Sequence, residues 1–157
     1  MVRVRRQLPD VAWRTTFIVG FPTETDQDFE ELVDFVSEGH FQHLGIFLYS
    51  DEDNIRSSKF GDPIPLSLKE ERKNRLMEIQ QKISREHHQK MVGSLQQVLV
   101  GGFSSETDLL LEGRNQYQGP EVDGVVYINE GNATSAGFHQ VEITEAHEYD
   151  LVGKILN

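Results

Sequence analysis

The spacing of apolar residues changes at about Gly93, and this change restricts the fold more than any other feature of the 157-residue sequence. Before Gly93, strand-like and helix-like patterns alternate, whereas after it short strand-like runs are separated by turn residues. Alternating patterns are typical of α/β structure, and short runs with turns are typical of small β-barrels. We therefore predict an α/β part followed by an all-β part.

The first part contains a strand, helix and strand pattern. Residues 15–19 are β-branched or aromatic and residues 44–50 form a second apolar run, so each predicts a strand buried on both faces. Between them, Thr25 and Asp28 have the spacing of a helix capping box, and Gly39 predicts the end of that helix. Apolar residues recur at helical spacing in this segment: Phe29, Leu32, Val33 and Val36. The pattern predicts a βαβ unit.

A long charged helix is predicted from Ser67 to about Met91, after a loop at residues 51–65 that is rich in proline, glycine and serine. Ser67 and Glu70 have the spacing of a second capping box. The apolar stripe of this helix is narrow and contains Leu76, Ile79, Ile83 and Met91. Lysine, arginine and glutamate alternate around the stripe, so we expect them to lie on solvated faces and to form pairs four residues apart.

The second part contains five β-rich runs with turn residues between them. These runs are residues 95–100, 109–112, 125–129, 138–144 and 149–156. They predict a small five-stranded antiparallel barrel. The expected domain boundaries are residues 1–66 for the α/β part, 67–92 for the connecting helix and 93–157 for the barrel.

The charge of the second part restricts its partners. Residues 93–157 contain two basic and ten acidic side chains, a net charge of -8. Affinity for nucleic acid comes largely from lysine and arginine, so we expect no direct binding of RNA. A basic protein partner is a better match, although an acidic surface that only maintains solubility remains an alternative.

The absence of cysteine excludes several kinds of chemistry. This chain cannot supply a thiolate nucleophile, a zinc thiolate site or the ligands of an iron-sulfur cluster. Its six histidines do not have the spacing of a metal site, so we predict none. The apolar runs are too short to span a membrane, and together with the missing cysteines they indicate a cytoplasmic protein with no membrane partner.

The junction at residues 20–25 is the first candidate for a functional site. Loops that follow parallel strands are where α/β-barrel enzymes place their sites. The helix that begins near Asp26 would also favour an anionic ligand group, such as a carboxylate, at its N-terminus. Composition alone does not distinguish this loop from an ordinary one.

The sequence of this junction resembles a known family. The run RTTFIVGFPTET at residues 14–25, followed by DF at 28–29, resembles the late-barrel segment of the radical-SAM methylthiotransferases. Similar motifs follow in the same order: YS at 49–50, EER at 70–72 and RLM at 75–77. Two features depart from the family pattern, since Thr23 replaces a glycine and residues 51–57 replace a loop containing Gly-Thr.

The part after Gly93 resembles a TRAM domain, an OB-like barrel. Its motifs are most similar to the RimO-type branch, which methylthiolates an aspartate of ribosomal small-subunit protein twelve. These motifs are GR at 113–114, PEVDG at 120–124, ITEA at 143–146 and YDLVG at 149–153. The resemblance implies the last βα units of an open, partial TIM-type barrel plus a TRAM domain. A truncated form of a longer enzyme is therefore expected, with one edge and apolar faces of the barrel strands exposed.

The resemblance also implies cofactors and residue roles. The complete enzymes use S-adenosylmethionine and two four-iron four-sulfur clusters. Without cluster cysteines, this chain alone is expected to have no catalytic residue, no bound cofactor and no activity. The residues expected to shape the S-adenosylmethionine pocket are Arg14, Ile18, Gly20, Phe21, Pro22 and Phe47. Ile18 and Phe47 are predicted to form an apolar wall of this pocket, and the alternative for both is simple core packing. Arg14 is predicted to pair with the cofactor carboxylate, and its alternative is a surface ion pair.

The acidic barrel is predicted to dock the basic ribosomal protein. Glu121, Asp123, Tyr149 and Asp150 are the expected docking residues, and the alternative for Asp123 is a turn cap. Two other functions stay open, namely the tRNA-adenosine branch of the same family and an interaction module without catalytic function.

Overall fold

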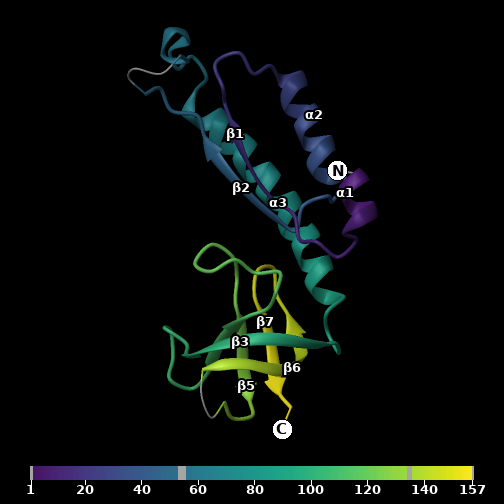
Figure 1. Cartoon of the computed structure of the whole chain (residues 1–157). Helices are drawn as coiled ribbons and strands as arrows, with labels where there is room; N and C mark the ends of the chain where they lie inside the picture. Colours follow the sequence, from purple (N-terminus) through teal and green to yellow (C-terminus); the bar gives the residue numbers. More distant parts are fainter. Residues whose placement is uncertain (1, 53–55, 134–135, 157) are drawn as a thin grey trace. The chain divides into compact units, whose positions relative to one another are not determined.

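The computed structural model describes residues 2–52, 56–133 and 136–156 (Figure 1). The elements before the barrel are α1 (Val2–Gln7), β1 (Arg14–Val19), α2 (Asp26–Ser37), β2 (His43–Leu48), the short 3-10 helix η1 (Ser58–Phe60) and α3 (Leu66–Gln89). The barrel strands are β3 (Leu95–Phe103), β4 (Leu111–Arg114), β5 (Val126–Glu130), β6 (Gly137–Ala146) and β7 (Leu151–Ile155). The chain divides into two compact units, Met1–Ile83 and Ser84–Asn157.

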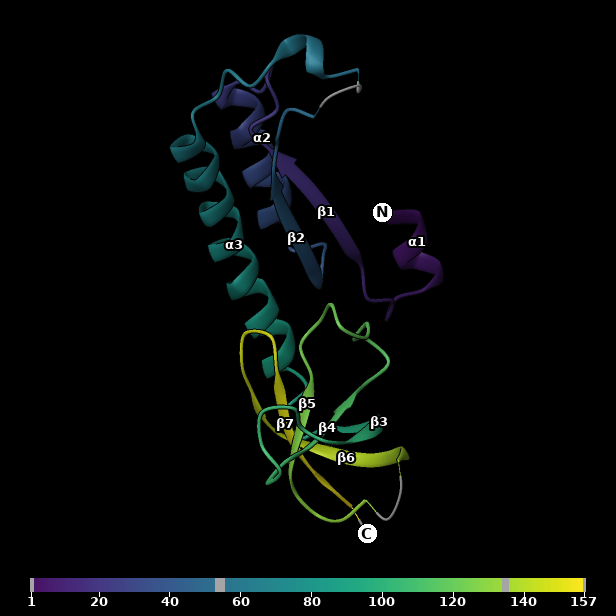
Figure 2. The ribbon, with the colours of Figure 1, turned by 90° about the vertical axis from the view of Figure 1, so that its left-hand side faces the viewer.

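The first unit is built on the parallel strands β1 and β2, which pair from Arg14 opposite His43 to Val19 opposite Leu48. Helices α2 and α3 lie beside these strands (Figure 2). Buried apolar side chains from both strands and both helices form one core: Val19, Phe29, Val33, Val36, Leu44, Ile46 and Leu76. The predicted strand, helix and strand arrangement is present, and hydrophobic burial is the main force that holds it together.

The two strands are buried on one face only. Ile18 and Phe47 lie opposite each other in the register, and their side chains are 58% and 63% exposed. Val19 and Ile46 point to the other face and are buried in the core, because successive side chains of a strand alternate between faces. The prediction that these strands are buried on both faces is therefore wrong, since α2 and α3 pack against a single face.

Helix α3 differs most from its prediction. It begins at Leu66, so Ser67 lies inside the helix and is not its cap. Leu76 is buried as expected, but most other buried side chains on this helix are polar: Lys69, Arg72, Gln80, Ser84 and His88. Each of these five side chains makes at least one hydrogen bond. Gln80 donates from Nε2 to the backbone oxygens of Phe41 and Gln42 at 3.2 and 3.1 Å, whereas its buried Oε1 has no hydrogen-bond partner in the described part of the chain.

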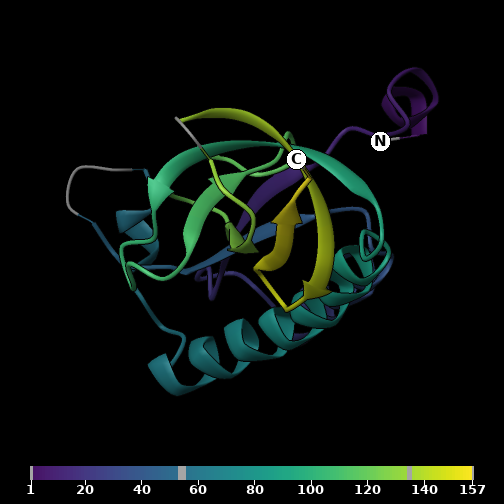
Figure 3. The same ribbon diagram turned by 90° about the horizontal axis from the view of Figure 1, so that it is seen from below.

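The second unit is a closed barrel with the strand order β3-β4-β5-β7-β6 (Figure 3). Four pairs of neighbouring strands are antiparallel, and β5 and β7 are parallel. The five predicted strands are present, but the prediction of an entirely antiparallel barrel is wrong. Five strands in a closed ring cannot all alternate in direction, because five is odd, so at least one neighbouring pair must be parallel.

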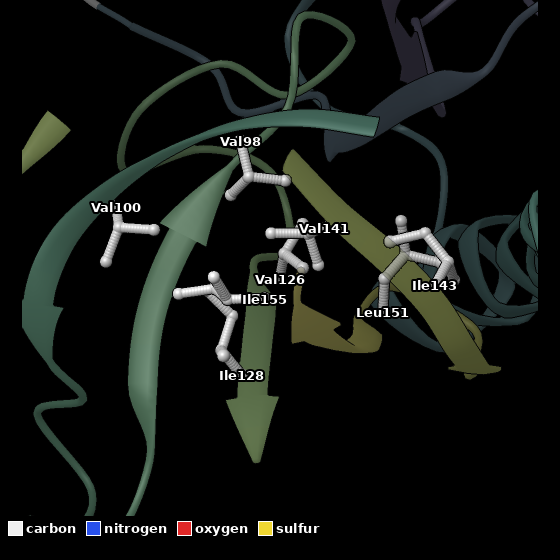
Figure 4. Packing of buried hydrophobic residues seen from close by; sticks show 8 residues of the cluster. All are labelled: Val98, Val100, Val126, Ile128, Val141, Ile143, Leu151 and Ile155. Atoms are coloured by element: carbon white, nitrogen blue, oxygen red, sulfur yellow. The ribbon is translucent and has the colours of Figure 1, made fainter. Parts of the chain in front are cut away.

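The barrel interior is filled by aliphatic side chains (Figure 4). Its buried residues are Val98, Val100, Val126, Ile128, Val141, Ile143, Leu151 and Ile155. Burial of such side chains stabilises a small barrel, each contributing about 1.5–3 kcal/mol relative to full exposure. In the described part of the chain, no helix is both long and apolar enough to cross a membrane.

Candidate functional site

The loop after β1 is held by hydrogen bonds within the loop. Gly20 has a φ of +79°, and its N–H donates to Oε2 of Glu24 at 3.0 Å. The N–H of Glu24 donates to the backbone oxygen of Phe21 at 2.8 Å, which closes a turn around Pro22 and Thr23. Thr23 is not strained, because among the described residues Glu121 is the one non-glycine residue with positive φ. The turn therefore accepts the β-branched Thr23, the residue expected to depart from the family pattern.

The start of α2 is capped as predicted. The hydroxyl and N–H of Thr25 both donate to Oδ2 of Asp28, at 2.7 and 2.9 Å, and the N–H of Asp28 donates back to the Thr25 hydroxyl. These hydrogen bonds, first from the hydroxyl and then from the backbone, lower the pKa of Asp28. Asp26 and Asp28 already place two carboxylates in the first helical turn, so the local charge opposes the anionic ligand group predicted there.

Two buried cations from α3 reach the loops that follow the strands, and neither was predicted from the sequence. Arg72, 3% exposed, donates from Nη1 to Oε1 of Glu24 at 2.5 Å and from Nη2 to Oδ1 of Asp26 at 2.6 Å. Lys69, 2% exposed, donates from Nζ to the backbone oxygen of Tyr49 at 2.8 Å and pairs with Asp62. A signal was available, because 69, 72 and 76 have the helical spacing of one buried face.

Aromatic side chains connect the same two loops. The ring of Phe21, after β1, lies edge-on to Tyr49, after β2, with ring centroids 5.3 Å apart. Phe21 also contacts Phe60 of η1 at 6.2 Å between centroids. Part of this second loop, residues 53–55, lies outside the described residues, so the expected difference from the family at 51–57 is described only in part.

The predicted cofactor residues lie toward opposite ends of the paired strands β1 and β2. Gly20, Phe21 and Pro22 follow β1 directly, and Ile18 and Phe47 form exposed apolar surface on the open face beside them. Arg14 is exposed at the start of β1, roughly 20 Å from Gly20 at ~3.3 Å per residue. The structure therefore brings five of the six residues to one region and leaves Arg14 at the far end of the strand.

The predicted docking residues lie on two adjacent segments of the barrel unit. Oδ2 of Asp123 accepts a hydrogen bond from the N–H of Gly119 at 2.6 Å, as the turn-cap alternative requires. Oδ1 of Asp150 accepts from the N–H of Val125 at 2.8 Å, and this bond joins the two segments. Both carboxylates therefore have a structural role in addition to any role in docking.

The other two docking residues are more exposed. Tyr149 is exposed, and Glu121 is exposed in a left-handed conformation with φ +63°. Position 124, next to these residues, requires glycine, because a Cβ there would overlap the backbone oxygen of Tyr149. The structure thus brings the four predicted docking residues into one region of the barrel surface.

The chain does not provide a metal centre in its described part. Among those residues, no group of three or more histidine, aspartate or glutamate side chains is arranged to hold a metal ion. The sequence has no cysteine, so its residues do not fit an iron-sulfur cluster.

Known proteins with similar sequences cover both units. The TRAM domain family matches residues 92–156.

Relatives named ribosomal protein uS12 methylthiotransferase RimO match almost the whole chain. The Desulfotalea psychrophila protein is 46% identical over 155 residues, which are 99% of this chain and 35% of the relative. The Bdellovibrio bacteriovorus protein is 48% identical over 156 residues, 99% of this chain and 34% of the relative. The Aquifex aeolicus protein is 43% identical over 152 residues, 96% of this chain and 35% of the relative. The chain therefore spans about a third of the length of these relatives.

Proposed function

The chain belongs to the RimO-type methylthiotransferase family, and on this premise we propose that it supplies the end of the radical-SAM barrel and the TRAM domain of an enzyme that methylthiolates an aspartate of ribosomal protein uS12. In this proposal residues 1–66 belong to the barrel, 67–92 connect the domains and 93–157 form the TRAM domain. The chain alone is inactive, because it has no cysteine to hold a cluster.

The extent of the sequence match carries the proposal. Identity of 46–48% extends over 99% of the chain, so it includes the first unit as well as the TRAM domain. A protein that shared only a mobile interaction module with this family would match over residues 92–156 alone. The open face of β1 and β2, with Ile18 and Phe47 exposed, also agrees with strands that form part of a larger barrel.

We propose that the face of β1 and β2 that carries the exposed side chains of Ile18 and Phe47 contributes to an S-adenosylmethionine site. Ile18 and Phe47 would form its apolar wall, and Gly20, Phe21 and Pro22 would shape the end of the pocket next to them. Arg14 is proposed as a partner for a carboxylate at the other end of this face. When bound, the cofactor would supply the radical, and these residues would bind it, orient it and exclude water.

The acidic TRAM domain is proposed to dock uS12. Glu121, Asp123, Tyr149 and Asp150 lie in one region of an acidic part of the chain. Charge complementarity with a basic protein increases the association rate and fixes orientation more than it increases affinity. The same charge disfavours tRNA, whose phosphates would be repelled.

A hybrid enzyme tests the proposal in cells. The aligned third of the Bdellovibrio bacteriovorus relative is replaced by this chain, and the hybrid is produced in cells that lack their own uS12 methylthiotransferase. Mass spectrometry should then find a methylthio group on one aspartate of uS12, as it should for the unaltered relative. A folded hybrid that contains its clusters but leaves uS12 unmodified would count against the proposal.

A further inference from the structure

Lys69 and Arg72 contact different loops from one turn of the same helix. The ammonium of Lys69 contacts the loop after β2 through the backbone oxygen of Tyr49 and the carboxylate of Asp62. The guanidinium of Arg72 contacts the loop after β1 through Glu24 and Asp26. Both loops follow the carboxyl ends of parallel strands, where α/β-barrel enzymes place their sites.

The contacts of Arg72 reach the backbone of its loop. Glu24 uses one carboxylate oxygen for Arg72 and the other for the N–H of Gly20. Arg72 therefore fixes the residue that follows β1 through one intermediate side chain. The guanidinium also lies over the ring of Phe29, at 5.2 Å from the centroid, which restricts its orientation.

The contacts of Lys69 are of two kinds. Its stem packs over Gly20, while its ammonium bonds to the other loop. A buried ammonium is stable only when it is paired and hydrogen-bonded, and Asp62 and Tyr49 supply these partners. The ammonium can therefore be removed without the stem, because methionine has nearly the same length.

We propose that Lys69 and Arg72 are positioning residues for the S-adenosylmethionine pocket, and that the charged group of each holds mainly one loop. Lys69 holds the loop after β2 and Arg72 holds the loop after β1. The identity of the ligand rests on the proposed function, whereas the holding of the loops does not.

Hydrogen exchange of the 157-residue chain tests the separate roles. Lys69→Met should increase amide exchange at residues 56–62 several-fold and change it much less at residues 20–26, which aromatic contacts connect to the first segment. Arg72→Met should have the reverse effect. Matched controls are Lys73→Met, one turn further along α3, and Arg75→Met, whose ion pair with Glu30 is solvent-exposed. Equal increases in both loops, or no increase in either, would overturn the proposal.

Variants of the acceptors provide a second test that leaves α3 intact, in case a buried substitution prevents folding. Asp62→Asn should reproduce the exchange pattern of Lys69→Met, and Glu24→Gln that of Arg72→Met. Glu70→Gln, on the exposed side of α3, is the control. If Asp62→Asn increases exchange mainly at residues 20–26, the assignment of Lys69 is wrong.

The hybrid enzyme tests the connection to the cofactor. Arg72→Met should weaken binding of labelled S-adenosylmethionine several-fold, measured by equilibrium dialysis of the cluster-containing hybrid, whereas Arg75→Met should not. If Arg72→Met leaves S-adenosylmethionine binding unchanged while the two variants show their separate exchange patterns, the assignment of these loops to the cofactor pocket is wrong. Failure of the exchange patterns would overturn the holding of the loops, whatever the hybrid binds.

Discussion

The stem of Lys69 occupies the space in which a side chain at Gly20 would lie. A Cβ at Gly20 would overlap Cγ of Lys69 and lie 2.8 Å from its Cδ. Gly20 also has positive φ, so two independent constraints require glycine at this position. The end of β1 and helix α3 therefore pack closely at Gly20, where only glycine leaves room for the Lys69 side chain.

Gly20→Ala should destabilise the first unit by about 2–4 kcal/mol, because it combines backbone strain of about 1 kcal/mol with overpacking against a buried side chain. Gly39→Ala is the matched control, since Gly39 has φ +70° and an added Cβ would meet only Cγ2 of Ile83, at 4.0 Å; it should cost only about 1 kcal/mol. Urea unfolding followed by the fluorescence of Trp13, the single tryptophan, measures both. Equal costs would show that Lys69 does not constrain Gly20.

Thr25→Val should raise the pKa of Asp28 toward its ordinary value, because the hydroxyl that contributes most to lowering it is lost. The rise should be incomplete, since the backbone N–H of residue 25 still donates. A carboxyl group with a lowered pKa in the folded state contributes stability above its unfolded pKa, and this is lost as pH falls through the folded pKa. Titration of the carboxyl carbon by NMR measures the change, and Thr23→Val is the control. An unchanged pKa would exclude the hydroxyl as its cause.

Asp150→Asn should lower the pKa of Tyr127. Burial raises this pKa, and the negative charges of Glu106, Asp150 and Glu112 raise it further. Because the folded pKa is raised, the corresponding stability is complete below the unfolded pKa of tyrosine and is lost as pH rises through the folded value. NMR titration of the Tyr127 ring should show a shift in Asp150→Asn and none in Asp108→Asn. Equal shifts in both would indicate a general charge effect.

Asp123→Asn and Asp150→Asn should slow association with uS12 at low salt while the melting temperature stays nearly constant. Asparagine keeps an oxygen that accepts the backbone hydrogen bond and removes the charge. Asp123→Ala should instead destabilise the barrel by about 1 kcal/mol, because the N–H of Gly119 loses its acceptor. Stopped-flow kinetics measure association, with Asp108→Asn as the control. If all three asparagine variants associate equally fast, these residues are not the docking surface.

Features that depend on local sequence were predictable. The Thr25 and Asp28 cap lies within four residues, and the five barrel strands follow from short runs and turns. The parallel pair β5 and β7 was not predicted, because strand pairing depends on closure of the whole ring.

The buried side of α3 was not predicted because its partners are distant in sequence. Arg72 is 48 residues from Glu24, and Lys69 is 20 residues from Tyr49. From the sequence alone, a lysine or arginine on a charged helix is expected to be solvated, since unpaired charges are rarely buried. The position of Arg14 was also not predictable. Arg14 and Gly20 belong to the same sequence motif, but they lie at opposite ends of β1.

The most direct test of the proposed function is substrate choice by the purified hybrid enzyme. The hybrid, with its clusters reconstituted, is given S-adenosylmethionine, uS12 and tRNA in one reaction, and both products are analysed by mass spectrometry. We expect a methylthio group on one aspartate of uS12 and none on tRNA. Methylthiolation of tRNA adenosine, or of neither substrate while the unaltered relative modifies uS12, would contradict it.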